Sequence, residues 1–204
     1  MKTAAFLISA CAIAAPASAG GTVVFSDLAS FLGQLDGAFL DEDFSGNTFA
    51  GDESFFSGNG FSATASTVDS PVDGDGFADV LFNDVGLLST NSATDALVLT
   101  FSANTTAVGG EFLSTDIDFI NSDATVTVTL GDGTVEDLGA FGGFVGFTNP
   151  AGISSITIDA LGTDSGGLPA FAAASSLVVG AVIPAPASAA LLGLGGLAAA
   201  RRRR

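Results

Sequence analysis

The sequence contains no His, Trp or Tyr, and its single cysteine, Cys11, lies near the N-terminus. Without His, and without a cysteine in the body of the chain, neither a Ser–His nor a Cys–His nucleophile pair can form there. The usual zinc ligands are missing for the same reason, and no disulfide can form within the body. We therefore expect a non-catalytic protein. A two-carboxylate glycosidase is the remote alternative, because that mechanism needs no other residue type.

Basic residues are confined to the two ends of the chain. Of the 5 Lys and Arg, Lys2 stands at the start and Arg201 to Arg204 at the end, whereas all 22 Asp and Glu lie between Asp27 and Asp164. The stretch from residue 3 to residue 200 therefore carries a formal charge of −22. A body without cations cannot neutralise phosphates, so nucleic-acid binding is excluded. Its carboxylates must be solvated, bind cations or repel one another.

The first 19 residues have the pattern of a secretory signal peptide. Lys2 precedes an apolar run from residue 4 to residue 15, and Ala17 and Ala19 form an A-x-A site that predicts cleavage before Gly20. An alternative is a lipobox at residues 8–11, which would make Cys11 a lipidated first residue. Either pattern predicts an exported protein.

The C-terminal residues, 181–204, have the three parts of a membrane-sorting signal. Pro184, Ala185 and Pro186 are followed by an apolar segment, 187–200, and by Arg201, Arg202, Arg203 and Arg204. Fourteen residues are fewer than the ~20 that span a bilayer as a helix, and the arginines would hold the end on the cytoplasmic side. This predicts a transient stop in the inner membrane; an ordinary C-terminal anchor helix is the alternative.

This tail resembles the PEP-CTERM sorting signal, although Ala185 stands where the family usually has Glu. The resemblance implies cleavage near the motif by an exosortase, a membrane cysteine protease-transpeptidase. It also implies a Gram-negative-type bacterium that makes exopolysaccharide or biofilm, with the processed protein at the cell surface or in the extracellular matrix.

The body, residues 20–180, is long enough for one domain with its own core. A short helix is predicted with Ser26 as N-cap, with Leu28, Phe31, Leu32 and Leu35 on one face, and with Gly37 at its end. Beyond it, period-two alternation and Gly-Asp-Gly or Asn turns predict short strands. The strand candidates are 96–101, 107–113, 124–130, 134–138, 144–148, 153–160 and 176–182.

Many strands with short connections predict an all-β domain, a β-sandwich or jelly roll with one short N-terminal helix and a C-terminal apolar sorting helix. The order of motifs is similar to a recurring body of PEP-CTERM proteins, which also implies a jelly-roll-like domain. Most of the 18 Phe are expected in the core. Asp116 and Asp118 are expected on one exposed face of a strand, and Asp41, Glu42 and Asp43 in a solvated loop.

One loop has the composition of a cation site. Asp73, Asp75 and Asp79 alternate with Gly and Ala around Gly74 and Gly76, and Ca²⁺ takes six to eight oxygen ligands from loops of this kind. The EF-hand pattern is incomplete, because Phe82 stands where the bidentate Glu would be. A solvated Asp-Gly turn and a calcium loop of another type are the two interpretations. The second suggests a calcium-dependent carbohydrate-binding module, possible by analogy with other jelly rolls, as the alternative function.

Overall fold

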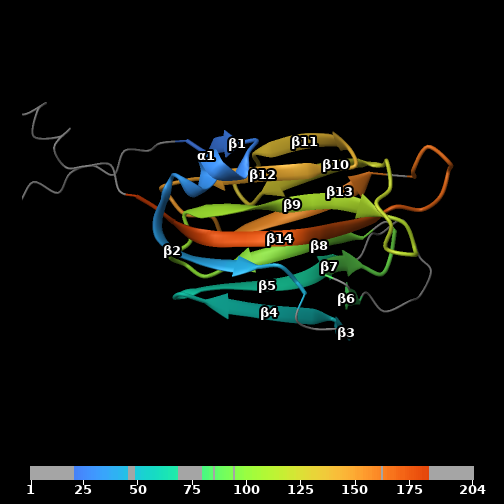
Figure 1. The fold of residues 1–204 in the computed structure, drawn as a ribbon, viewed down its shortest axis with the longest axis horizontal. Helices are drawn as coiled ribbons and strands as arrows, with labels where there is room; N and C mark the ends of the chain where they lie inside the picture. Colours follow the sequence, from blue (N-terminus) through green and yellow to red (C-terminus); the bar gives the residue numbers. More distant parts are fainter. Residues whose placement is uncertain are drawn as a thin grey trace, which may run out of the picture. The chain divides into compact units, whose positions relative to one another are not determined.

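The protein is a sandwich of two antiparallel β-sheets, one of eight strands and one of six, with one short helix (Figure 1). The computed structural model describes residues 21–45, 49–68, 80–84, 86–93, 95–161 and 163–183. Residues 20–184 form one compact unit. The predicted all-β sandwich is thereby confirmed. The predicted sorting helix lies outside the described residues.

The eight-stranded sheet has the order β1-β12-β9-β14-β7-β6-β3, and β2 also pairs with β14. Its strands are β1 (Val23–Phe25), β2 (Leu35–Glu42), β3 (Phe49–Gly51), β6 (Leu81–Asp84), β7 (Leu87–Thr90), β9 (Ala107–Thr115), β12 (Gly143–Thr148) and β14 (Phe171–Val182). The six-stranded sheet, in the order β11-β10-β13-β8-β5-β4, contains β4 (Glu53–Gly58), β5 (Phe61–Val68), β8 (Ala96–Phe101), β10 (Thr125–Leu130), β11 (Val135–Ala140) and β13 (Ser155–Leu161). The helix is α1 (Leu28–Leu32).

The main core lies between the two sheets and follows the alternation of the strands. On β10, Val126, Val128 and Leu130 are buried, and the threonines between them are partly exposed. From the facing sheet, Phe112 and Phe147 are fully buried. An alternating strand presents one face to the core and the other to solvent, so the sequence pattern that predicted β10 also predicted its buried face.

Most predicted strands are confirmed, with ends that differ by a few residues. The candidate at 96–101 coincides with β8, and those at 107–113, 124–130, 134–138, 144–148 and 153–160 correspond to β9 to β13. The candidate at 176–182 is the second half of β14, which begins five residues earlier at Phe171. β14 is the centre of its sheet, with β9 along one edge and β7 and β2 sharing the other.

The prediction that Asp116 and Asp118 lie on a strand face is wrong. β9 ends at Thr115, and residues 116–120 form a tight turn. One carboxylate oxygen of Asp116 accepts the backbone N–H groups of Asp118 and Ile120, both at 2.9 Å. Local bonds from an Asp side chain compete with sheet ladders, which is why the strand stops here. Asp41 and Glu42, expected in a loop, form the end of β2.

The helix is shorter than predicted and begins one residue later. Its N-cap is Asp27 rather than Ser26, and the Asp27 carboxylate accepts the N–H of Ser30 at 2.8 Å. It ends at Leu32 with Gly33 as C-cap, so Leu35 belongs to β2. Phe31 is the fully buried residue of α1, whereas Leu28 is 46% exposed. Among the described residues, no helix is long and apolar enough to cross a membrane.

Candidate functional site

The outer face of the eight-stranded sheet is covered at two places and open between them. At one place, α1 lays the ring of Phe31 over Gly109 of β9 and Gly146 of β12. The approach is so close that a Cβ on Gly146 would lie 2.6 Å from Cδ2 of Phe31. At the other place, Phe119 packs on a small cluster of Leu87, Leu113 and Ala173. The open part is a hollow of about 480 Å³, which is our candidate site.

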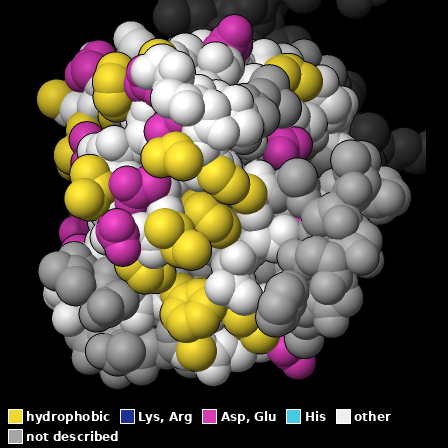
Figure 2. All heavy atoms as spheres, turned by 90° about the vertical axis from the view of Figure 1, so that its right-hand side faces the viewer, with side chains coloured by type: hydrophobic (Ala, Val, Ile, Leu, Met, Phe, Trp, Pro, Cys, Tyr) yellow, Lys and Arg dark blue, Asp and Glu magenta, His cyan; other side chains and the backbone are white. Residues whose placement is uncertain are grey.

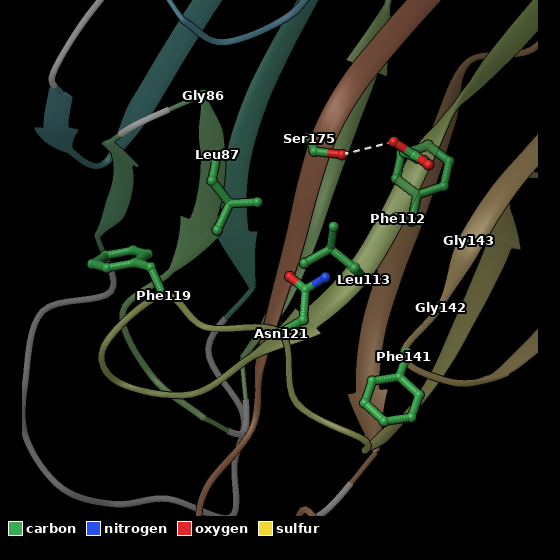
Figure 3. Close-up of a pocket in the computed structure, with 11 residues that line it drawn as sticks. Gly86, Leu87, Phe112, Leu113, Phe119, Asn121, Phe141, Gly142, Gly143 and Ser175 are labelled. Atoms are coloured by element: carbon green, nitrogen blue, oxygen red, sulfur yellow. Dashed lines mark hydrogen bonds between the residues drawn. The ribbon is translucent and has the colours of Figure 1, made fainter.

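Three elements besides β9 and β14 border this hollow: the start of β7, the turn 116–120, and the 141–143 region, where the β11–β12 turn leads into β12. In the close-up, Phe119 and Phe141 lie on opposite sides, with Leu113 and Asn121 between them (Figure 3). The floor is apolar where Leu87 and Leu113 lie. The site therefore combines an apolar floor, aromatic rings at two margins and a few polar groups, a composition common in small-ligand sites.

The turn that holds Phe119 has a counterpart elsewhere in the chain. In both turns, an Asp at the first position accepts N–H bonds from the third and fifth residues: Asp116 from Asp118 and Ile120, and Asp164 from Gly166 and Leu168. The fourth residue has a positive φ in each, 60° at Phe119 and 79° at Gly167. Phe119 thus occupies a position that favours glycine.

Packing offsets the conformational cost at Phe119. Its ring contacts the cluster of Leu87, Leu113 and Ala173 and meets the ring of Phe82 edge-on, with centroids 6.3 Å apart. Left-handed backbone costs a non-glycine residue ~1–2 kcal/mol. Full burial of a large apolar side chain contributes ~1.5–3 kcal/mol, and the partly buried Phe119 gains a share of it. The role of Phe119 is accounted for by this structural contact.

The paired turns also present aliphatic side chains to solvent at one end of the sandwich. Ile117, Ile120 and Leu168 are 79%, 63% and 57% exposed. Figure 2 shows hydrophobic side chains gathered in the middle of this end, with acidic side chains around them. The N–H of Ser165 donates to the Asp123 carboxylate at 2.7 Å and links the two turn regions. The Ser165 hydroxyl and this N–H together hold the pKa of Asp123 below its usual value.

Phe141 is held at the rim of the hollow by an unusual turn. Phe141, Gly142 and Gly143 have φ of 69°, 70° and 155°. The turn lies directly on β9: a Cβ on Gly142 would overlap the carbonyl oxygen of Phe112 and lie 2.7 Å from Cα of Leu113. Only glycine fits there. Phe141 itself is 56% exposed, so, in contrast to Phe119, burial does little to offset its left-handed conformation.

The polar groups of the hollow come from β9, β14 and the segment after the turn. A β-bulge in β14 leaves Ser175 without a partner in the register between Ala174 and Ser176. Ser175 Oγ then reaches the Glu111 carboxylate at 3.3 Å (Figure 3). Asn121 is exposed and lines the hollow next to Leu113 (Figure 3). Bulges often redirect a side chain next to a functional site, and here the bulge brings a hydroxyl to the single carboxylate among the described lining residues.

The chemical repertoire of the described lining is limited to binding groups. Glu111 can accept several hydrogen bonds, Ser175 can donate and accept, and the Asn121 amide can do both. A glycosidase needs two carboxylates on opposite sides of the sugar, and the described lining residues supply only Glu111. Over the described ranges, no group of three or more Asp, Glu, His or Cys side chains could hold a metal ion.

The site residues predicted from the sequence fall outside the described residues. Asp73, Asp75 and Asp79 of the candidate calcium loop fall in 69–79, outside the described residues. The same holds for the sorting residues Pro184, Ala185, Pro186 and Arg201–Arg204, and for Ala17 and Ala19 of the leader. The sequence did not reveal Glu111 and Ser175 as a pair; the one available signal was Phe141 followed by two glycines.

A second polar cluster joins the start of the described chain to the sandwich. Asp132, in the predicted Gly-Asp-Gly turn between β10 and β11, accepts bonds from Thr22 Oγ1 at 2.7 Å and from Asn149 Nδ2 at 3.1 Å. The N–H of Thr134 and the Thr22 hydroxyl lower the pKa of Asp132. Because all three groups satisfy one another near the surface, we assign this cluster to structure.

Neither a family model, nor a characterised protein, nor a solved structure matches the chain. Its function must therefore be inferred from its own residues.

Proposed function

We propose that this is an exported, non-catalytic protein of the cell surface or extracellular matrix of a Gram-negative-type bacterium, associated with exopolysaccharide or biofilm. An exosortase-type protease would process it at the C-terminal signal, during a transient insertion of the tail into the inner membrane. The observation that carries the proposal is the order Pro184–Ala185–Pro186, apolar segment, Arg201–Arg204 at the C-terminus.

The end of the sandwich supports this assignment of the tail. β14 runs to Val182, two residues past the boundary expected at 180, and the N–H of Ile183 still donates to the carbonyl of Gln34 at 2.9 Å. The Pro-Ala-Pro motif begins at the next residue. Cleavage at or after the motif would therefore leave every described strand intact.

The jelly-roll description of the body is also part of the proposal. It is supported by connections that pass from one sheet to the other, as β8–β9, β9–β10, β11–β12, β12–β13 and β13–β14 all do. Such crossings are typical of Greek-key sandwiches and jelly rolls.

Mass spectrometry of the exported protein tests the proposal. We expect a chain that begins at Gly20 and lacks Arg201–Arg204, and we expect the arginines to be retained when the host's exosortase gene is deleted. Replacement of Pro184 and Pro186 by Ala should block processing, whereas Phe55→Ala, at an exposed residue of β4, should not. An exported wild-type protein with intact arginines would defeat the proposal, and an acylated Cys11 would replace the predicted leader cleavage by the lipobox alternative.

A further inference from the structure

We propose that the hollow on the eight-stranded sheet binds a sugar unit of a neutral or amine-bearing polysaccharide, with Phe141, Glu111 and Ser175 as the contacting residues. The inference rests on the proposed function for the setting in which such a polymer is met. It is argued from the conformation of Phe141, the polar pair on the floor, and the charge of the chain.

Phe141 is the first argument, because its conformation is costly and its surroundings do not compensate for it. A left-handed phenylalanine that is 56% exposed has neither the steric freedom of glycine nor the packing that Phe119 has gained. Backbone strain of this kind is found at ligand contacts and active sites. The turn fixes an exposed aromatic ring at the rim of a concave surface, where it can contact a ligand.

The second argument is the arrangement of polar groups beside that ring. One face of a pyranose ring is dominated by C–H bonds, whereas its edge carries hydroxyls. Glu111 and Ser175, joined at 3.3 Å, offer acceptors and a donor for two neighbouring hydroxyls, and Asn121 adds an amide. The volume of about 480 Å³ lies within the ~300–1,000 Å³ typical of small-ligand sites.

The third argument is charge complementarity, which restricts the class of sugar. Residues 3–200 carry 22 acidic side chains and no Lys, Arg or His, so no cationic side chain of the processed chain could pair with a uronate, sulfate or phosphate. A polymer of acidic sugars would be repelled. A neutral sugar would meet no penalty, and the ammonium of an amino sugar would form a charge-assisted bond with Glu111.

Isothermal titration calorimetry of the purified exported protein tests this with three probes: hexamers of glucose, glucosamine and galacturonate. We expect the glucose or the glucosamine hexamer to bind and the galacturonate hexamer not to bind. Glu111→Gln should weaken binding of the glucosamine hexamer about tenfold, because it removes a charge-assisted hydrogen bond. It should affect the glucose hexamer less.

A matched pair of variants isolates the aromatic ring. Phe141→Asn should reduce affinity about tenfold or more, and the melting temperature should stay the same or rise, because Asn tolerates a left-handed backbone. Phe55→Asn makes the same change at an exposed residue of β4, in the other sheet, and should leave binding intact. Binding of galacturonate as tight as that of the other hexamers, binding of none of the three, or full affinity in Phe141→Asn would overturn the proposal. Mass spectrometry measures the processing of the tail and calorimetry measures sugar binding. A failure of the proposed function can therefore be distinguished from a failure of the proposed sugar site.

Discussion

Gly146→Ala tests how α1 is attached to the sandwich. An alanine Cβ at this position would lie 2.6 Å from Cδ2, 2.8 Å from Cγ and 3.2 Å from Cβ of Phe31. Cγ lies on the axis about which the ring rotates, so turning the ring cannot relieve this contact. Phe31 is also fully buried and flanked by Phe25 and Phe144 at centroid distances of 6.0 and 5.9 Å. The helix would have to move away from the sheet.

Overpacking of this kind costs ~1–3 kcal/mol. At ~2–4 °C per kcal/mol for a chain of this size, the melting temperature should fall by ~2–12 °C. Differential scanning calorimetry of the purified protein would measure it. Gly21→Ala serves as the control, since nothing lies within 4 Å of a Cβ built there.

A double-mutant cycle separates the clash from any other effect of alanine. Phe31→Ala alone should destabilise by ~3–5 kcal/mol. In that background, Gly146→Ala should be neutral or slightly stabilising, because the clash is gone and alanine reduces the entropy of the unfolded chain. We therefore expect a coupling energy of ~1 kcal/mol or more. Additive effects, or a Gly146→Ala variant as stable as Gly21→Ala, would refute the close approach of Phe31 to β12.

Two further predictions concern carboxylates. Burial raises the pKa of Asp159 on β13, so folding favours the protonated form of this carboxyl. The contribution of Asp159 to the free energy of unfolding therefore becomes more favourable as the pH falls through that pKa. Asp159→Asn should therefore stabilise at pH 7, by no more than about 0.5 kcal/mol because solvent screens this half-buried carboxylate, and the gain should disappear near pH 3. An equal gain from Asp118→Asn, which removes the same charge from an exposed turn, would show that only net charge matters. The calcium-loop interpretation of Asp73, Asp75 and Asp79 predicts that Ca²⁺ at 100 times its Kd adds ~2.7 kcal/mol of stability and so raises the melting temperature. Asp75→Ala should abolish the rise, and equal, weak shifts with Ca²⁺ and Mg²⁺ would favour the solvated turn with charge screening alone.

The strands predicted most accurately have either a strict alternation of apolar and polar residues, as in β10, or an almost continuous apolar run, as in β8. β8 and β10 read Ala-Leu-Val-Leu-Thr-Phe and Thr-Val-Thr-Val-Thr-Leu, and their predicted ranges were correct to within one residue. β5 was not predicted, although it alternates as well. Its buried positions after Phe61 are Ala63 and Ala65, which give a weak hydrophobic signal among Ser and Thr.

β2 could not be read from its sequence because its alternation is broken. Between Leu35 and Phe39 the strand has three residues opposite the single residue 181 of β14. Gly37, in this interval, has φ of 97°. The two extra residues preserve the parity of the strand: Leu35 and Phe39 pack in the cluster around Phe31, whereas Leu40, of the opposite parity, lies in the core between the sheets. Because both faces of β2 carry packed apolar residues, no simple apolar–polar alternation marks the strand, and the helical spacing of Leu28, Phe31 and Leu35 was the stronger signal.

The candidate site was beyond reach from the sequence for a related reason. Glu111 and Ser175 are 64 residues apart, and their contact depends on a bulge that only the pairing of β14 with β9 reveals. The position of Phe141 depends on the fit of Gly142 against the backbone of β9. Neither a bulge nor a close contact between two backbones produces a periodic pattern in the sequence.

Charge connects the tail to the ligand proposed for the hollow. The tail holds four of the five basic residues and the leader holds the fifth, Lys2, so the proposed removal of both would leave a chain whose charged side chains are all acidic and which anionic surfaces would repel. Salt then distinguishes the two sugar classes. Because the Debye length falls from ~10 Å at 0.1 M to ~3 Å at 1 M salt, binding of a glucosamine hexamer should weaken strongly over that range. Binding of a glucose hexamer, which depends on Phe141 and on neutral hydrogen bonds, should change little. A neutral ligand would thus be the one that this hollow retains in saline surroundings.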